Sequence, residues 1–86
     1  MEYYIKHKIL LKEVNQSYLL IDLTIGKTYK LNNSAGKIVS MISKEVKIDD
    51  MVLSILDEYN IDPKSAREMC IMILEELVKK KVIVIN

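Results

Sequence analysis

The sequence contains no tryptophan and no phenylalanine, and it has only one cysteine, one proline, one histidine and two glycines. Without the largest apolar rings, the core has to be built mainly from aliphatic side chains. The lone Cys70 cannot form an internal disulfide, which is typical of the reducing cytoplasm, so we expect a cytoplasmic location. No apolar run approaches the roughly 20 residues of a membrane span, and residues 1–8 lack the apolar centre of a signal peptide. We therefore expect no association with a membrane.

The sequence is also poor in patterns that carry chemistry. His7 lies in a terminal stretch, and Cys70 falls on an apolar helical stripe, where a small core residue is the usual interpretation. The acidic pairs 49–50 and 75–76 are consecutive, so a helix points the two members of each pair apart. No spacing offers three metal ligands, and the two glycines form no phosphate-binding loop. We therefore expect no catalytic residue, no metal, no cofactor and no enzymatic activity.

The 86 residues are enough for one core and too few for two, so we expect a single domain over residues 1–86. Half of the residues are hydrophobic, which supports a compact core despite the small size. The formal net charge is +1, so no overall field attracts nucleic acid or an anionic membrane. We expect neither of them as a partner.

The first half of the chain predicts an antiparallel three-stranded sheet. Alternating and apolar segments give strands over residues 8–14, 18–23 and 27–31, and Gly26 supplies the positive φ of a short hairpin loop. We expect residues 1–7 to be a flexible stretch before the first strand. The third strand lies at the edge of this small sheet, where another extended chain can pair with it.

The second half predicts three helices, each with an apolar stripe at helical spacing. The first helix runs from a cap among residues 32–34 to about Ser43, the second starts near Asp49, and the third runs from Pro63 to about Lys80. Residues 82–85 then form a short strand or the edge of a wing. The fold class is α+β and winged-helix-like, a three-stranded antiparallel sheet followed by three helices.

The third helix has more apolar residues than one core stripe needs. Ala66, Cys70, Ile73, Leu74 and Leu77 make a sufficient stripe, and further apolar side chains flank it on both sides. Neighbouring helices can cover both flanks, as in any small bundle. Alternatively, one flank lines a groove, for which methionine is well suited because it adapts to varied partners.

The whole pattern resembles the PqqD-like proteins, also called RiPP recognition elements. These proteins bind the leader segments of ribosomally synthesised, post-translationally modified peptides. The similarity is carried by LLIDLTIGKTYKLNNSAGKIVSMI and by IDDMVLSILDEYNIDPKSAREMCIMILEELVKKKVI, and it covers about residues 8–85. The sequence departs from the family pattern at Met69, where an acidic residue is frequent, and at Lys81, where glycine is frequent. The first departure suggests a more apolar contact with the leader.

The resemblance implies that a leader peptide adds as an antiparallel strand to the third strand and lies between it and the last helix. The protein would be a non-catalytic adaptor that delivers the precursor to a separate enzyme, either a radical SAM enzyme or a leader peptidase with its cyclase, as in lasso-peptide biosynthesis. The residues predicted to bind peptide are Lys27, Thr28, Tyr29, Lys30, Leu31, Met69, Met72, Ile73 and Glu76.

Other interpretations of these residues stay open. The lysines of the third strand also serve as ordinary protection against edge-to-edge aggregation, and Tyr29 is also a typical half-buried strand residue. A winged-helix DNA-binding regulator is the main alternative function, although its recognition helix would carry three glutamates over residues 63–80. A third alternative is a homodimer in which the edge strand pairs with its own copy.

Overall fold

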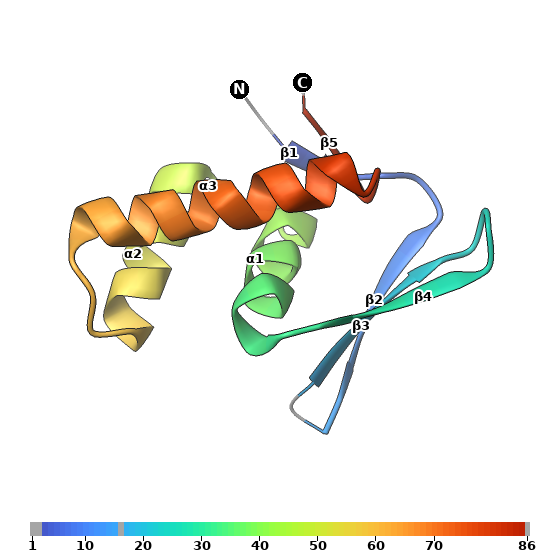
Figure 1. Ribbon diagram of the computed structural model, residues 1–86, viewed down its shortest axis with the longest axis horizontal. Helices are drawn as coiled ribbons and strands as arrows, with labels where there is room; N and C mark the ends of the chain where they lie inside the picture. The colour runs from blue at the N-terminus through green and yellow to red at the C-terminus, as the bar shows by residue number, and fades with distance from the viewer. Residues whose placement is uncertain (1–2, 16, 86) are drawn as a thin grey trace.

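The computed structural model describes residues 3–15 and 17–85 and shows a small sheet beside three helices (Figure 1). The strands are β1 (Tyr3–Ile5), β2 (Ile9–Val14), β3 (Ser17–Asp22), β4 (Lys27–Leu31) and β5 (Ile83–Ile85). The helices are α1 (Asn33–Ser43), α2 (Ile48–Glu58) and α3 (Pro63–Lys79). The predicted α+β class and the three helices are therefore confirmed.

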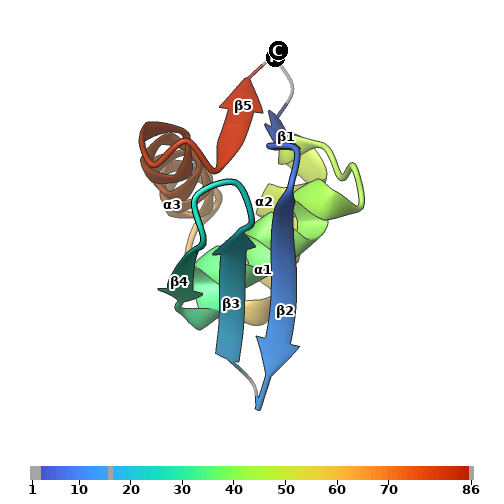
Figure 2. The ribbon, with the colours of Figure 1, turned by 90° about the vertical axis from the view of Figure 1, so that its right-hand side faces the viewer.

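The main sheet has the strand order β2-β3-β4 and is antiparallel throughout. One face of the sheet is buried, because Leu20 at its centre is fully covered and α1 packs behind it (Figure 2). At the β3–β4 turn, the buried Asp22 accepts a hydrogen bond from the main-chain N–H of Thr24, 2.9 Å away. Gly26 has a φ of +66°, as its place in the turn requires.

The helices begin where the sequence signals predict. The Asn32 side chain accepts a hydrogen bond from the Ala35 N–H and caps α1, and Asp62 accepts one from the Ser65 N–H and caps α3. Hydrogen bonding with Ser65 lowers the pKa of Asp62 below its ordinary value. Both caps satisfy donors that the first helical turn would otherwise leave unpaired.

All three helices contribute to one hydrophobic cluster with the strands. The fully buried side chains at its centre include Leu20, Ile38, Met51, Leu74 and Ile83. In α1, Gly36 is buried along with Ile38, Val39 and Ile42, whereas Ala35 is only partly buried. Within the described residues, no helix is both long and apolar enough to cross a membrane.

The expectation of a flexible N-terminus over residues 1–7 is wrong for Tyr3–Ile5. These residues form β1 and pair with β5 in a second, two-stranded sheet (Figures 1 and 2). Tyr3 and Ile5 pack against the core, and the Lys6 N–H bonds to the Val82 carbonyl oxygen, 2.9 Å away. The two ends of the chain stabilise each other, and this pairing over almost the whole chain length is invisible to local sequence patterns. Met1 and Glu2 lie outside the described residues.

Candidate functional site

The outer edge of β4 offers main-chain groups that the sheet does not use. The Leu23 N–H bonds to the Lys8 carbonyl oxygen, 3.0 Å away, which makes the adjoining Ile9–Asp22 pair a non-hydrogen-bonded pair between β2 and β3. In an antiparallel sheet, the main-chain N–H and C=O groups of successive residues point alternately to one neighbouring strand and to the other. Those of Asp22 therefore point to β4, where Asp22 pairs with Lys27.

The same alternation then assigns each residue of β4. Lys27, Tyr29 and Leu31 direct their N–H and C=O groups toward β3. Thr28 and Lys30 direct theirs away from β3, to the free edge. No strand among the described residues pairs with this edge. The edge can therefore accept one more strand.

The β4 side chains divide between the two faces of the sheet. Tyr29 and Leu31 lie on the core face, where Tyr29 is half-buried and Leu31 is buried. The ammonium group of Lys27 lies 5.2 Å from the centre of the Tyr29 ring, a cation–π contact. Thr28 and Lys30 are exposed on the opposite face. Leu31 is thus withdrawn from the surface, whereas Lys27 and Tyr29 stand together at it.

The α3 residues predicted for the site occupy one flank of the helix. Arg67 marks the other flank, because its guanidinium bonds to Asp49 of α2 with 2.6 Å between Nη2 and Oδ1. Successive residues of a helix are about 100° apart around its axis, so the four α3 residues that were predicted to bind peptide share the flank turned away from α2. They are Met69, Met72, Ile73 and Glu76.

Exposure along this flank grades from the core to the solvent. Met69 and Ile73 are partly buried and pack against the hydrophobic cluster, whereas Met72 is 65% exposed. Glu76 lies at the far end with Lys80, 3.9 Å between the carboxylate oxygen and the ammonium nitrogen. The flank is therefore an apolar strip with one exposed methionine and a charged end.

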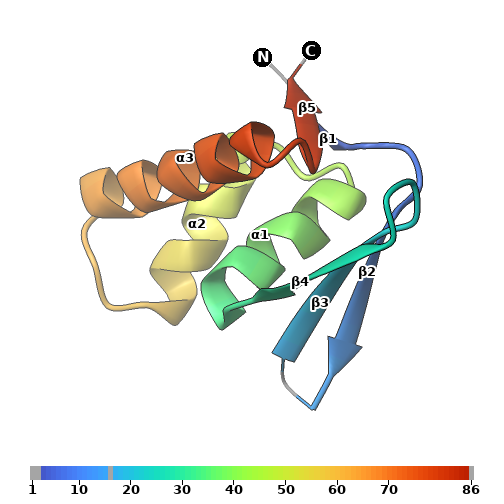
Figure 3. The same ribbon diagram turned by 45° about the vertical axis from the view of Figure 1, so that its right-hand side comes forward.

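The helix α3, which carries the strip, and the strand β4 lie on the same side of the molecule. Figures 2 and 3 both show α3 and β4 there, with α1 packed against each of them. The elements that carry the predicted strand and helix residues thus lie on one side of the molecule, although Leu31 itself is buried.

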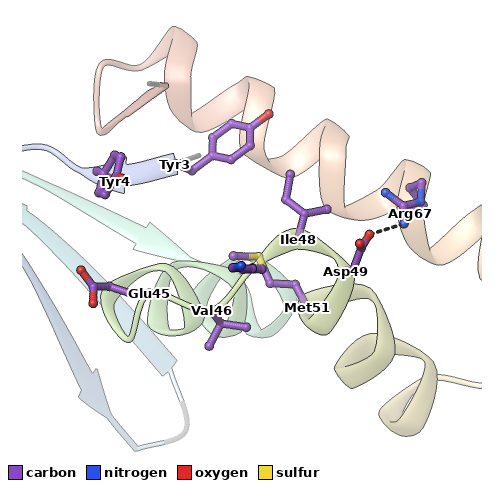
Figure 4. A pocket seen from close by; sticks show the side chains of 9 residues that line it. Tyr3, Tyr4, Glu45, Val46, Ile48, Asp49, Met51 and Arg67 are labelled. Atoms are coloured by element: carbon purple, nitrogen blue, oxygen red, sulfur yellow. Dashed lines mark hydrogen bonds and ion pairs between the residues drawn. The ribbon is translucent and has the colours of Figure 1, made fainter. Parts of the chain in front are cut away.

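The structure also contains a pocket that the sequence did not predict. It measures about 650 Å³ and lies on the Arg67 side of α3, away from the strip (Figure 4). Tyr3 and Ile48 line it beside the Arg67–Asp49 ion pair. Its lining combines β1 with α2 and α3, so no local pattern reveals it.

The single cysteine is buried, and the single histidine is exposed. Burial raises the pKa of the Cys70 thiol, which keeps it protonated in the core. His7 is exposed, and no three His, Cys, Asp or Glu side chains among residues 3–15 and 17–85 gather into a metal-binding group. The groups that this side of the molecule presents are hydrogen-bonding main chain, apolar side chains and the charged side chains of Lys27, Lys30 and Glu76.

A family profile described as "Coenzyme PQQ synthesis protein D (PqqD)" matches residues 12–83. The chain belongs to the PqqD family. The resemblance predicted from the sequence is confirmed. No curated protein matches the chain.

Two solved structures share the fold of this PqqD-family chain. "TbiB1 in Complex with the TbiA(beta) Leader Peptide" is 19% identical with a TM-score of 0.86, and the match covers 93% of each chain. "Lasso peptide synthetase B1 complexed with the leader peptide" is 18% identical with a TM-score of 0.88, and the match covers 99% of this chain and 100% of that one. Each of those two proteins was captured with a leader peptide.

Proposed function

We propose that this PqqD-family chain is a non-catalytic, cytoplasmic adaptor that binds the leader of a ribosomally synthesised precursor peptide as a strand added to β4. It delivers the precursor to a separate enzyme, either a radical SAM enzyme or a leader peptidase with its cyclase. The observation that carries the proposal is the unpaired edge at Thr28 and Lys30, on the same side of the molecule as α3, the helix with the apolar strip. The two leader-bound structures of the same fold support it.

The free edge accounts for affinity without sequence preference. Thr28 and Lys30 each offer one N–H and one C=O, so an added strand gains up to about four main-chain hydrogen bonds. At roughly 0.5–1.5 kcal/mol net for each bond, the edge contributes about 2–6 kcal/mol before the cost of ordering the peptide. Selectivity therefore has to come from the side chains.

Side-chain selectivity follows from the alternation of the added strand. Every second peptide residue points to the core face, toward the strip that contains Met69 and Ile73, and we expect these residues to be apolar. The intervening residues point to the outer face beside Lys30, where acidic side chains are favoured. Tyr29 and the stacked Lys27 border the core-face positions.

The DNA-binding alternative is not favoured by the charges on α3. Its exposed surface carries Glu68, Glu75 and Glu76, which repel phosphate. Arg67 is already paired with Asp49. The helix therefore offers few of the free cations that a recognition helix needs.

A fluorescence anisotropy titration with a labelled synthetic leader of the cognate precursor tests the proposal. Met72→Glu places a charge on the exposed part of the strip, and we expect it to weaken binding by about tenfold or more because the carboxylate loses water against apolar side chains. Leu53→Glu is the matched control, since Leu53 on α2 is 62% exposed and Met72 65%. Equal affinity for both variants, or no binding by the unmodified chain, would contradict the proposal.

A further inference from the structure

The outer face of the main sheet is apolar and uncovered. Figure 2 looks onto this face, and no helix or strand of the described chain lies in front of it. Strand alternation places an apolar group here, opposite to the buried Leu20, and we name it the outer patch. It consists of Leu10, Leu19, Ile21 and Leu23.

The outer patch is continuous across neighbouring strands. Leu10 lies directly opposite Ile21 in the register of β2 and β3, and Leu19 is the next outward residue of β3. Leu10 is 51% exposed and Leu23 is 56% exposed. Leu19 and Ile21 are half-buried between them. A group of adjacent aliphatic side chains that reach the surface is typical of a protein-binding surface.

Lysines border the outer patch, and carboxylates are absent from this face of the described strands. Lys12, Leu19 and Lys30 form one row across the three strands. Glu13 and Asp22, the acidic residues of these strands, alternate to the opposite face. The face therefore combines an apolar centre with a positive border.

We propose that the outer patch is the docking surface for the processing enzyme, which would meet it with an apolar surface bordered by aspartate or glutamate. This inference rests on the proposed function. The patch adjoins β4, so a peptide added to that edge extends the same face. An enzyme docked on the patch would lie next to the outward side chains of the bound peptide.

The charges argue against a second copy of the chain as the occupant. Two copies stacked face to face would bring Lys12 and Lys30 of both into one interface without carboxylates on this face to pair with them. Like charges brought together in an interface cost several kcal/mol. An acidic border on the partner removes this cost and adds attraction.

The test measures two affinities for each variant by surface plasmon resonance. The probes are the immobilised enzyme that processes the cognate precursor and, separately, the synthetic leader peptide. We expect Leu10→Glu and Lys12→Glu each to weaken enzyme binding by about tenfold or more, with peptide binding unchanged, because both residues lie on β2, away from the β4 edge. Leu53→Glu, at an exposed apolar site on α2, should change neither affinity.

The inference would be overturned if both β2 variants bound the enzyme with the same affinity as the unmodified chain. It would also be overturned if sedimentation showed a dimer of the unmodified chain that the Leu10→Glu change dissociates. Failure of the proposed function is a different result, in which the unmodified chain does not bind the leader. Thermal unfolding checks that each variant is folded. If Leu10→Glu is not, Lys12→Glu still decides, since Lys12 is an exposed side chain.

Discussion

At the scale of single residues, the contact between Gly36 and Tyr18 sets how closely α1 packs on β3. The Tyr18 ring occupies the space in which a Cβ at position 36 would lie. Tyr18 belongs to the same sheet face as the buried Leu20. Position 36 therefore admits no larger side chain without displacing the ring.

Gly36→Ala should lower the free energy of unfolding by about 1–3 kcal/mol, because the methyl group overpacks the contact. In an ordinary helix interior the same change raises stability by about 1 kcal/mol, so the sign of the effect is diagnostic. Urea denaturation monitored by circular dichroism measures it. In a background that carries Tyr18→Ala, Gly36→Ala should cause a smaller loss in the free energy of unfolding, because the ring is gone. An increase in stability on Gly36→Ala alone would contradict the packing of Tyr18 on Gly36.

Two helix ends use residues other than glycine in the left-handed conformation. Lys81 after α3 has a φ of +61°, and Glu45 after α1 has a φ of +60°. At the end of α3, the Lys81 N–H bonds to the Val78 oxygen and the Val82 N–H to the Leu77 oxygen, which is a Schellman motif. The departure from the family glycine at position 81 therefore leaves the turn in place, at a conformational cost.

Lys81→Gly should raise the free energy of unfolding by about 1 kcal/mol, because glycine adopts a positive φ without the steric cost of a Cβ. Lys79→Gly is the control, since Lys79 is the last residue of α3, has a helical conformation and should lose up to about 1 kcal/mol of stability on this change. Guanidinium denaturation compares the two variants. Loss of stability in both would show that position 81 is not strained.

At the scale of elements, β4 is a strand with two inequivalent sets of main-chain groups. Lys27, Tyr29 and Leu31 face β3, and Thr28 and Lys30 face the free edge. A proline removes one N–H donor wherever it is placed. Its effect on folding and on peptide binding therefore depends on which set it enters.

Lys30→Pro should leave the β3–β4 pairing in place and weaken leader binding by about tenfold or more, since it removes a donor only from the free edge. Tyr29→Pro should instead lower the free energy of unfolding, because it removes a donor to β3. Anisotropy titration and thermal unfolding of the two variants separate these effects. A folded Tyr29→Pro variant with normal pairing, together with an unfolded Lys30→Pro variant, would reverse the assignment of the edge.

At the scale of the whole molecule, β1 and β5 join the two ends of the chain over one core. Ile5 of β1 lies opposite Ile83 of β5, and Ile83 is almost fully buried. The Ile5 side chain also packs against the hydrophobic cluster. Fixing both ends limits fraying of the helix that carries the apolar strip, because β5 follows α3 directly and contacts it.

Ile5→Ala should lower the free energy of unfolding by about 2 kcal/mol, because it removes apolar side-chain atoms from the core. Ile25→Ala is the matched control, since Ile25 in the β3–β4 turn is 64% exposed and should change stability little. Urea denaturation of both variants measures the difference. Equal stability would mean that the N-terminal residues contribute nothing, as the sequence alone suggested.

Local chemistry in the sequence determined the parts of this protein that depend on near neighbours. The capping Asn32 and Asp62, the Pro63 start and the glycine of the β3–β4 turn act within a few residues, so the bounds of α1, α3 and β4 were predicted closely. Apolar spacing likewise predicted that Met69 flanks the core stripe of α3, whereas Ile73, which it placed in that stripe, is only partly buried.

Tertiary structure alone decided the features that depend on distant segments. It joined β1 to β5, placed the Tyr18 ring over Gly36 and buried the predicted site residue Leu31. It also directed the main chain of Thr28 and Lys30 to the free edge, because that direction depends on how β2 pairs with β3. Contacts between residues far apart in the chain leave no periodic trace in the sequence, and only the packed molecule shows which faces they cover.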